Sequence, residues 1–137
     1  MLPINLFAIE LVKKELLIET SKTILNLISG INEFNLDYVN MILENLDIIK
    51  TIELVDSLYK NINNKYLLAH KIIAYNNLHD ISIKIKKELE LINKGIKESE
   101  NYWFKFLRTP PYHENIENLK KYKIILDNRL DIALKIP

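Results

Sequence analysis

The chain has 137 residues, of which 48% are hydrophobic and 27% are charged, and its formal net charge is +1. This length suits a single domain with its own core, and the apolar share argues against intrinsic disorder. A net charge near zero gives no electrostatic indication of nucleic-acid binding. With only two glycines and four prolines, the chain has few residues for the many turns of a β fold. It contains no cysteine, which excludes disulfides and thiolate metal sites.

The N-terminal residues are apolar but lack the pattern of a targeting segment. No basic residue precedes them, and Glu10 interrupts an apolar run that is about half the length of a membrane span. We therefore expect a cytoplasmic protein without membrane contact. Frequent Ile, Asn and Lys residues are typical of an AT-rich genome.

Two helices are predicted in the first 62 residues. The first begins near Pro3, where proline is tolerated in the first turn, and ends near Ser29, with Gly30 suited to a left-handed cap. The second follows Asn35, whose side chain suits the N-cap position, and continues to about residue 62. Its apolar stripe consists of Val39, Ile42, Leu46, Ile49, Ile52, Tyr59 and Ile62.

The longest element is predicted between residues 64 and 108. Two rows with a spacing of seven define it, and nine of their twelve positions are apolar. One row is Leu68, Tyr75, Ser82, Leu89, Ile96 and Trp103, and the other is Lys71, Leu78, Ile85, Ile92, Ser99 and Phe106. A period of about 3.5 residues over this length indicates a long helix seated in a bundle and continuous through Gly95.

Consecutive prolines at positions 110 and 111 separate this helix from a last helix, which is predicted from about Glu114 to Lys135. Short connections between four helices favour antiparallel neighbours. We predict an all-α fold, namely an antiparallel bundle of about four helices with the long helix at its centre. We expect residues 1–137 to form one domain.

An aromatic cluster lies near the end of the long helix. Tyr102, Trp103 and Phe104 fan over roughly 200° of a helix surface, and Phe106 lies on the predicted seam. Such residues are enriched where protein interfaces are strongest, although a neighbouring helix that covered them would make them part of the core. We predict that Tyr102, Trp103, Phe104 and Phe106 bind a partner, which is either another protein or a second copy of the chain.

These features favour a non-catalytic protein–protein interaction or structural module. Immunity proteins, antitoxins, viral host-binding factors and assembly subunits act in this way, by burying an apolar helix face. No metal site is expected, because His70 and His79 are nine residues apart and a site needs about three or four ligands. No cofactor is expected either, since the sequence has no Gly-rich loop that could cradle phosphates.

The C-terminal half suggests a third and weaker function. Residues 63–137 hold fourteen basic and nine acidic residues. A basic face there could bind nucleic acid, but Asp127 has helical-neighbour spacing to Lys120 and Lys123 and dilutes such a patch. Nucleic acid is therefore an unlikely partner.

Arg108 and His113 are separated by four residues. This spacing in an all-helical domain resembles the motif of HEPN-domain ribonucleases. The resemblance implies a helical bundle in which Arg108 and His113 act together on an RNA phosphodiester, usually at a dimer cleft. Thr109 stands where that family usually has Asn, Asp or His. A HEPN-like ribonuclease, or an inactive relative of one, is the alternative function.

Overall fold

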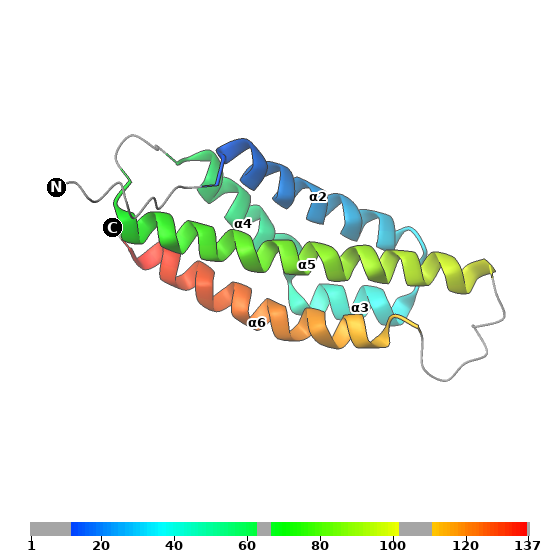
Figure 1. Cartoon of the computed structure of the whole chain (residues 1–137). Coiled ribbons are helices and arrows are strands. Elements are labelled where there is room, and N and C mark those ends of the chain that lie inside the picture. Colours follow the sequence, from blue (N-terminus) through cyan, green and yellow to red (C-terminus); the bar gives the residue numbers. More distant parts are fainter. Residues whose placement is uncertain (1–11, 63–66, 102–110, 137) are drawn as a thin grey trace.

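The computed structural model describes residues 12–62, 67–101 and 111–136, and every regular element in these ranges is an α-helix. The helices are α2 (Lys14–Asn32), α3 (Asp37–Leu46), α4 (Ile48–Lys60), α5 (Ala69–Asn101) and α6 (His113–Lys135), as Figure 1 shows. The prediction of an all-helical protein is confirmed.

The first described helix, α2, begins and ends later than predicted. Lys13 precedes it with non-helical backbone angles, φ −51° and ψ 133°, so one helix from Pro3 to Ser29 does not form. Residues 1–11 lie outside the described part of the chain. Gly30 is helical and α2 continues through it to Asn32, so Gly30 is not the left-handed cap that the sequence suggested.

The second predicted helix is in fact two helices. Asp47 adopts left-handed backbone angles, φ 56° and ψ 37°, and separates α3 from α4. Asp tolerates this conformation better than most residues, because its short polar side chain can bond locally. The break changes the phase of the apolar stripe: Ile48 is fully buried, whereas Ile49, which was predicted to be buried, is 43% exposed.

The turn before α3 also differs from the prediction. Asn35 is left-handed with φ 55°, so it belongs to the chain reversal after α2. Leu36, and not Asn35, occupies the N-cap position of α3, and no side chain caps the helix there.

The longest described helix, α5, contains 33 residues and remains helical through Gly95, as predicted. It begins at Ala69 rather than at residue 64, after the non-helical Leu67 and Leu68, and its predicted continuation beyond Asn101 lies outside the described residues. The two predicted rows supply most of its buried face, since the following side chains are 4% exposed or less: Tyr75, Leu78, Ser82, Ile85, Leu89, Ile92 and Ile96.

The last helix, α6, agrees closely with its predicted range. It begins at His113, one residue before the predicted start, and it ends at Lys135. Its buried apolar residues are Ile116, Leu119, Leu126, Leu130 and Ala133. Lys123 is buried as well, and its ammonium group binds both carboxylate oxygens of Asp127 at 2.8 and 2.9 Å.

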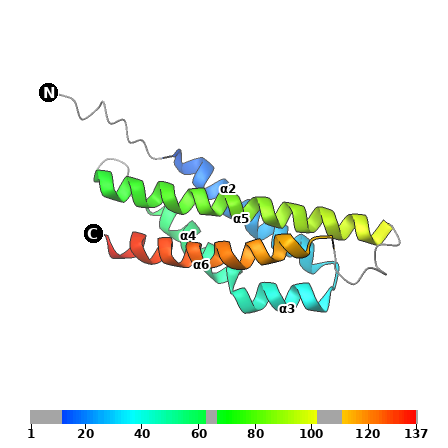
Figure 2. The ribbon, with the colours of Figure 1, turned by 60° about the horizontal axis from the view of Figure 1, so that its bottom comes forward.

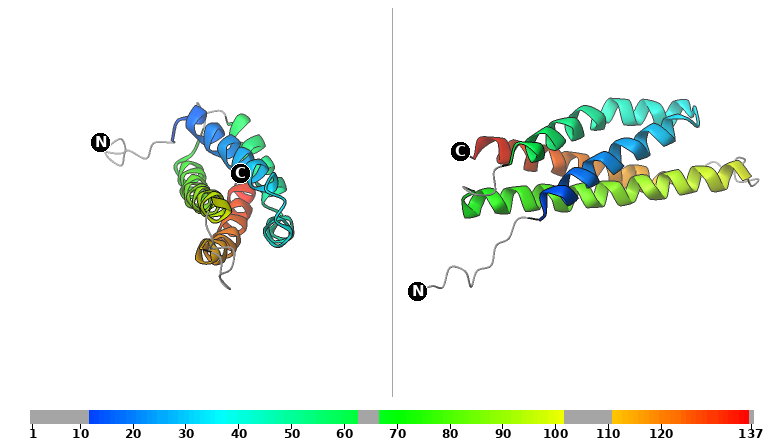
Figure 3. Two further views of the ribbon diagram at one scale, coloured as in Figure 1. Left: turned by 90° about the vertical axis from the view of Figure 1, so that its right-hand side faces the viewer. Right: turned by 90° about the horizontal axis from the view of Figure 1, so that it is seen from above.

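The packing of the helices places α3 at the edge of the molecule. Helix α5 packs against α6 and α2, and α2 also packs against α4. The chain alternates in direction, with α3 and α4 following one another along a single leg (Figure 1). Both Figure 2 and the end-on view in Figure 3 show α3 at the periphery, away from α5. The described part therefore holds five packed helices rather than about four.

Contacts along the α5–α6 seam follow an antiparallel register. Each step toward the C-terminus of α5 meets a residue nearer the N-terminus of α6. In order, the pairs are Lys71 with Ile136, Asn77 with Arg129, Lys84 with Tyr122, Glu88 with Asn118, and Gly95 with Tyr112. Four of these contacts involve a polar or charged group, so they fix the register as well as the direction of packing.

Candidate interaction surface

Two left-handed residues set the position of α3. Asn35 reverses the chain after α2, and Asp47 redirects it into α4. The main-chain carbonyl of Asp47 also accepts the Thr51 hydroxyl at 2.9 Å, which holds the first turn of α4. Three buried apolar side chains then attach α3 to the core: Val39, Ile42 and Leu43.

A groove lies between α3 and α6. Its volume is about 280 Å³, and its lining consists of Tyr38, Met41, Ile42, Asn45, Leu46 and Lys120. Tyr38 and Met41 are 50% and 51% exposed. An aromatic ring beside a flexible thioether forms the kind of surface that proteins use to contact one another.

A larger cavity lies on the other side of α3, between α2 and the junction of α3 with α4. Its volume is about 500 Å³, and Ile28, Leu43 and Ile49 supply its apolar lining. The polar lining consists of Asn32, Asn40, Glu44, Asp47, Lys50 and Glu53. The Oδ1 atom of Asn40 is buried without a hydrogen-bond partner. Helix α3, the groove and the cavity are together called the α3 surface.

The charges on the two sides of α3 differ. In the groove, Lys120 Nζ lies 2.9 Å from Glu117 Oε2, and this hydrogen bond raises the pKa of Lys120 and lowers the pKa of Glu117. Both shifts favour the charged forms at neutral pH, so the pair is neutral as a whole. In the cavity, no carboxylate forms an ion pair with a described residue, which leaves Glu44, Asp47 and Glu53 unneutralised.

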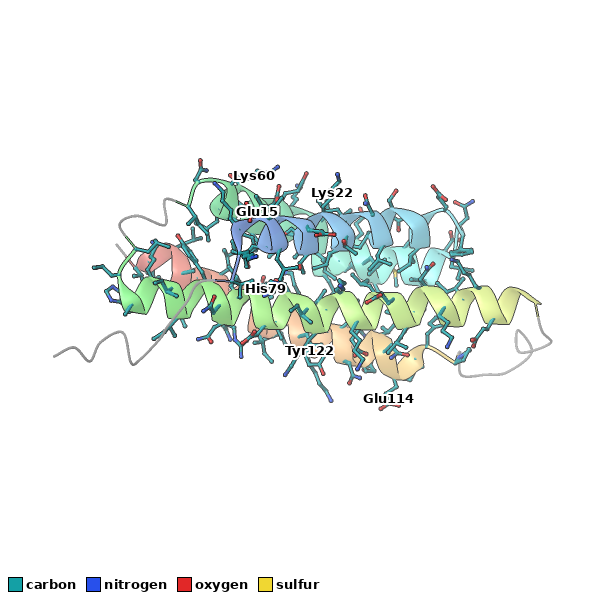
Figure 4. The ribbon with its side chains drawn as sticks, turned by 45° about the horizontal axis from the view of Figure 1, so that its top comes forward. Glu15, Lys22, Lys60, His79, Glu114 and Tyr122 are labelled. Atoms are coloured by element: carbon teal, nitrogen blue, oxygen red, sulfur yellow. The ribbon has the colours of Figure 1, made fainter. Side chains whose placement is uncertain are left out.

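Polar groups at the α2–α5 contact are enclosed rather than open to a ligand. His79 is 3% exposed, and its Nε2 lies 3.2 Å from the Thr20 hydroxyl oxygen (Figure 4 labels His79 on α5 beside α2). Because that hydroxyl donates to the carbonyl of Leu16, the neutral His79 ring donates from Nε2 to Thr20. Burial lowers the pKa of His79. This pair therefore joins two helices and offers no accessible base.

Tyr59 on α4 is also enclosed. Its side chain is fully buried, its ring stacks edge-on against Tyr75 with centroids 6.5 Å apart, and its hydroxyl oxygen has no hydrogen-bond partner. Burial is the larger effect and raises the pKa of Tyr59, whereas the neighbouring Ser82 side chain lowers it. The phenol is thus neutral at ordinary pH and serves the packing of the core.

Most of the predicted site residues are not among those that the structure describes. Tyr102, Trp103, Phe104 and Phe106 lie outside the described residues, and so does Arg108. Of the alternative ribonuclease pair, only the histidine at position 113 is described, as an exposed residue at the start of α6. Within the described ranges, no group of three or more His, Cys, Asp or Glu side chains could hold a metal ion.

Sequence reasoning missed the α3 surface. Tyr38 and Met41 lie off the apolar stripe of Val39 and Ile42, and a large apolar residue off the stripe was the available signal. The cavity had no such signal, because it forms where Asp47 breaks a pattern that otherwise predicts one helix.

Comparisons of this chain with protein-family models, with curated proteins and with solved structures found no match. Among the described helices, none is both long enough and apolar enough to cross a membrane.

Proposed function

We propose that this chain is a non-catalytic interaction module that binds another protein through the α3 surface. The observation that carries the proposal is the half exposure of Tyr38 and Met41 beside the groove between α3 and α6. Covering the exposed half of each side chain would contribute about 1 kcal/mol, half of the value for full burial of such a residue. Tyrosine is also among the residues that dominate binding energy at interfaces.

In this proposal the other helices are a scaffold. Helix α5 is the long central member of an antiparallel bundle, and α3 is held at its edge, where a partner can reach it. The aromatic residues Tyr102, Trp103, Phe104 and Phe106 follow α5 in the chain and remain predicted partner contacts. We expect the complex to form in the cytoplasm.

Affinity capture of the tagged protein from its native source tests the proposal. The test variant combines Tyr38→Ser with Met41→Ser. The matched control combines Ile124→Ser with Ile132→Ser, two α6 residues that are 64% and 55% exposed and line neither the groove nor the cavity. We expect a stoichiometric partner with the parent and the control but not with the test variant. A folded test variant that retains the partner would refute the proposal.

A second copy of the chain is the alternative partner. Light scattering of the purified protein over a range of concentrations distinguishes the two cases. One outcome is that the molar mass of the parent rises from that of a monomer to that of a dimer as the concentration increases. If the Tyr38→Ser, Met41→Ser variant then keeps the mass of a monomer, the α3 surface would be assigned to self-association. A single mass throughout would leave a different protein as the partner. A variant with Tyr102→Ser and Phe104→Ser tests the predicted aromatic contacts in the same assays.

A further inference from the structure

The segment of residues 23–49, which contains α3, carries only negative side-chain charge. Residues 23–49 contain four carboxylates and no Lys, Arg or His. The four are Glu33, Asp37, Glu44 and Asp47, and all are exposed. None of them forms an ion pair with a described residue. Like charges without counter-ions raise the local negative potential, so this segment favours cations.

Elsewhere on the described surface, acidic and basic residues occur together and some of them form ion pairs. Five ion pairs are formed within single helices, with partners three or four residues apart. They are Asp56–Lys60, Glu98–Lys94, Glu117–Lys120, Asp127–Lys123 and Asp131–Lys135. Acids without an ion pair to a described residue also occur elsewhere, for example Glu15, Glu19 and Glu90, so residues 23–49 are set apart by their lack of any basic residue.

The cavity beside α3 contains both apolar side chains and carboxylates, which suit the stem and the charged end of a long cationic side chain. Ile28, Leu43 and Ile49 can pack against an aliphatic stem. Around them stand three carboxylates against one ammonium, that of Lys50, which forms no ion pair with a described residue. The buried Asn40 Oδ1 is an acceptor without a donor. A buried acceptor left unpaired lowers stability, so a ligand N–H that reached it would stabilise the complex.

We propose that the partner bound by the α3 surface is a basic amphipathic helix of another protein, and that this helix inserts a Lys or Arg side chain into the cavity. The inference rests on the proposed function and names the chemistry of the partner. The stem of the inserted side chain packs on Leu43 and Ile49, and its charged end meets Glu44 and Asp47. An apolar residue of the same helix covers Tyr38 and Met41 in the groove on the other side of α3.

Charge complementarity selects this occupant over others. The phosphates of a nucleic acid or a membrane surface would be repelled by four unpaired carboxylates. A free diamine would satisfy the cavity but leave the Tyr38 and Met41 side chains exposed. Only a chain segment that carries both cationic and apolar side chains meets both sides of α3.

Two synthetic peptides test the proposal with the full chain. Each is about 14 residues long, or about four helical turns, and places Leu on one face. One peptide has Lys on the other face and its counterpart has Glu. We expect the Leu/Lys peptide to bind with shifts of the Asn40, Glu44 and Asp47 amide signals, and the Leu/Glu peptide not to bind. Raising the ionic strength from about 0.01 M to about 0.15 M, which shortens the Debye length from roughly 30 Å to 8 Å, should weaken binding.

Three variants locate the contact. Glu44→Gln with Asp47→Asn removes two cavity charges, and Asn is the substitution best suited to the left-handed position 47. We expect a roughly tenfold loss of affinity, which corresponds to about 1.4 kcal/mol. The control, Glu15→Gln with Glu19→Gln, makes the same charge change on α2 outside the cavity and should bind as the parent does. Asn40→Ala leaves the charge unchanged and should weaken binding about threefold, because it removes the cavity acceptor.

Three outcomes would overturn the inference. They are equal binding of the two peptides, equal losses in the cavity and control variants, and binding of 1,5-diaminopentane as tight as that of the Leu/Lys peptide. The test also separates this inference from the proposed function. The distinguishing result is that the Tyr38→Ser, Met41→Ser variant loses binding of the natural partner while the Glu44→Gln, Asp47→Asn variant keeps it. In that case the proposed interaction module is supported and the proposal of a basic partner is wrong.

Discussion

Buried polar groups have hydrogen-bond partners in the α5–α6 seam, whereas some polar groups at the α3 surface have none among the described residues. In the seam, the buried Glu88 carboxylate accepts hydrogen bonds from Asn115 and Asn118 at 3.0 and 3.2 Å. At the α3 surface, Asn40 has a buried acceptor without a donor, and Glu44 lies beside it without a cation. Satisfied polar groups fix one packing arrangement. Unsatisfied ones gain when a partner arrives, which is why the second region is the place to look for binding.

The largest expected effect is a difference in the free energy of unfolding between one truncation in the seam and one at the α3 surface. Leu119 of α6 is fully buried, whereas Met41 of α3 is half exposed. Leu119→Ala should lower the free energy of unfolding by about 3 kcal/mol, and Met41→Ala by less than about 0.5 kcal/mol. Urea unfolding followed by circular dichroism measures both. Comparable losses would mean that Met41 belongs to the core and that the contrast between the regions is wrong.

The polar contact in the seam gives the next effect. Glu88→Ala should lower the free energy of unfolding by about 2 kcal/mol, because it strips a buried charged acceptor from two amide donors. Glu90→Ala, an exposed neighbour on α5, is the matched control and should change it by less than about 0.5 kcal/mol. Combined with Asn118→Ala, the Glu88 variant should lose less than the sum of the two single changes. Strict additivity would show that the two side chains do not interact.

The two glycines give a smaller effect with opposite signs. Nothing lies within 4 Å of a Cβ built on Gly30, so Gly30→Ala should raise the free energy of unfolding by about 1 kcal/mol. A Cβ on Gly95 would lie 3.1 Å from the Cβ of the buried Tyr112. Gly95→Ala should therefore lower the free energy by about 1 kcal/mol, since the seam must open. Thermal unfolding of both variants tests this, and equal stabilisation by both would show that the seam yields easily.

The smallest effect depends on pH and concerns the α2–α5 contact. Because burial lowers the pKa of His79 in the folded state, the unfolded chain takes up its proton first as the pH falls. The contribution of His79 is fully present above pH about 6.5 and declines as the pH falls from there to the lowered value. The opposing charges of Asp80 and Lys86 modify the shift. Urea midpoints at neutral and acidic pH should differ less in a His79→Gln variant than in the parent; an unchanged pH dependence would rule out this residue.

The sequence predicts α5 well because apolar residues fill most of one face of the helix. Its apolar rows hold their phase, so spacing predicts seven of the buried positions from Tyr75 to Ile96, although His79, Ile81 and Glu88 are buried as well. The polar Ser82 fits on that face because its hydroxyl donates to the carbonyl of Leu78 at 2.9 Å. Lys71, the first polar position of the rows, donates its ammonium to the carbonyl of Ile136.

The division between α3 and α4 was not predictable from the same pattern. Ile48 and Ile49 are identical residues, so composition does not decide which of them is buried. The choice is made by Asp47, whose left-handed backbone rotates α4 relative to α3. A single polar residue within an apolar stripe is normally read as a solvated position of a continuous helix, so a backbone change of this kind leaves no periodic signal.

The candidate site was predicted least well, and the reason is geometric. The predicted contacts at Tyr102, Trp103, Phe104 and Phe106 remain predictions, because they lie outside the described residues. The cavity is made by Ile28 of α2 together with Glu44 and Glu53, which come from three separate helices. Residues that far apart in the chain become neighbours only through packing. Spacing rules within one helix cannot anticipate such a set.

The placement of Val12 and Ile136 bears on how the protein can be handled. The Val12 amide donates to Asn76 at 3.1 Å, and the Ile136 carbonyl accepts from Lys71, so both lie beside the early turns of α5. Helix α3 lies toward the opposite end of α5 in Figure 1. Immobilisation on a sensor chip through a tag beyond either residue would therefore orient the α3 surface toward the bulk solution. The same tether would leave the face formed by the early turns of α5 shielded by the support.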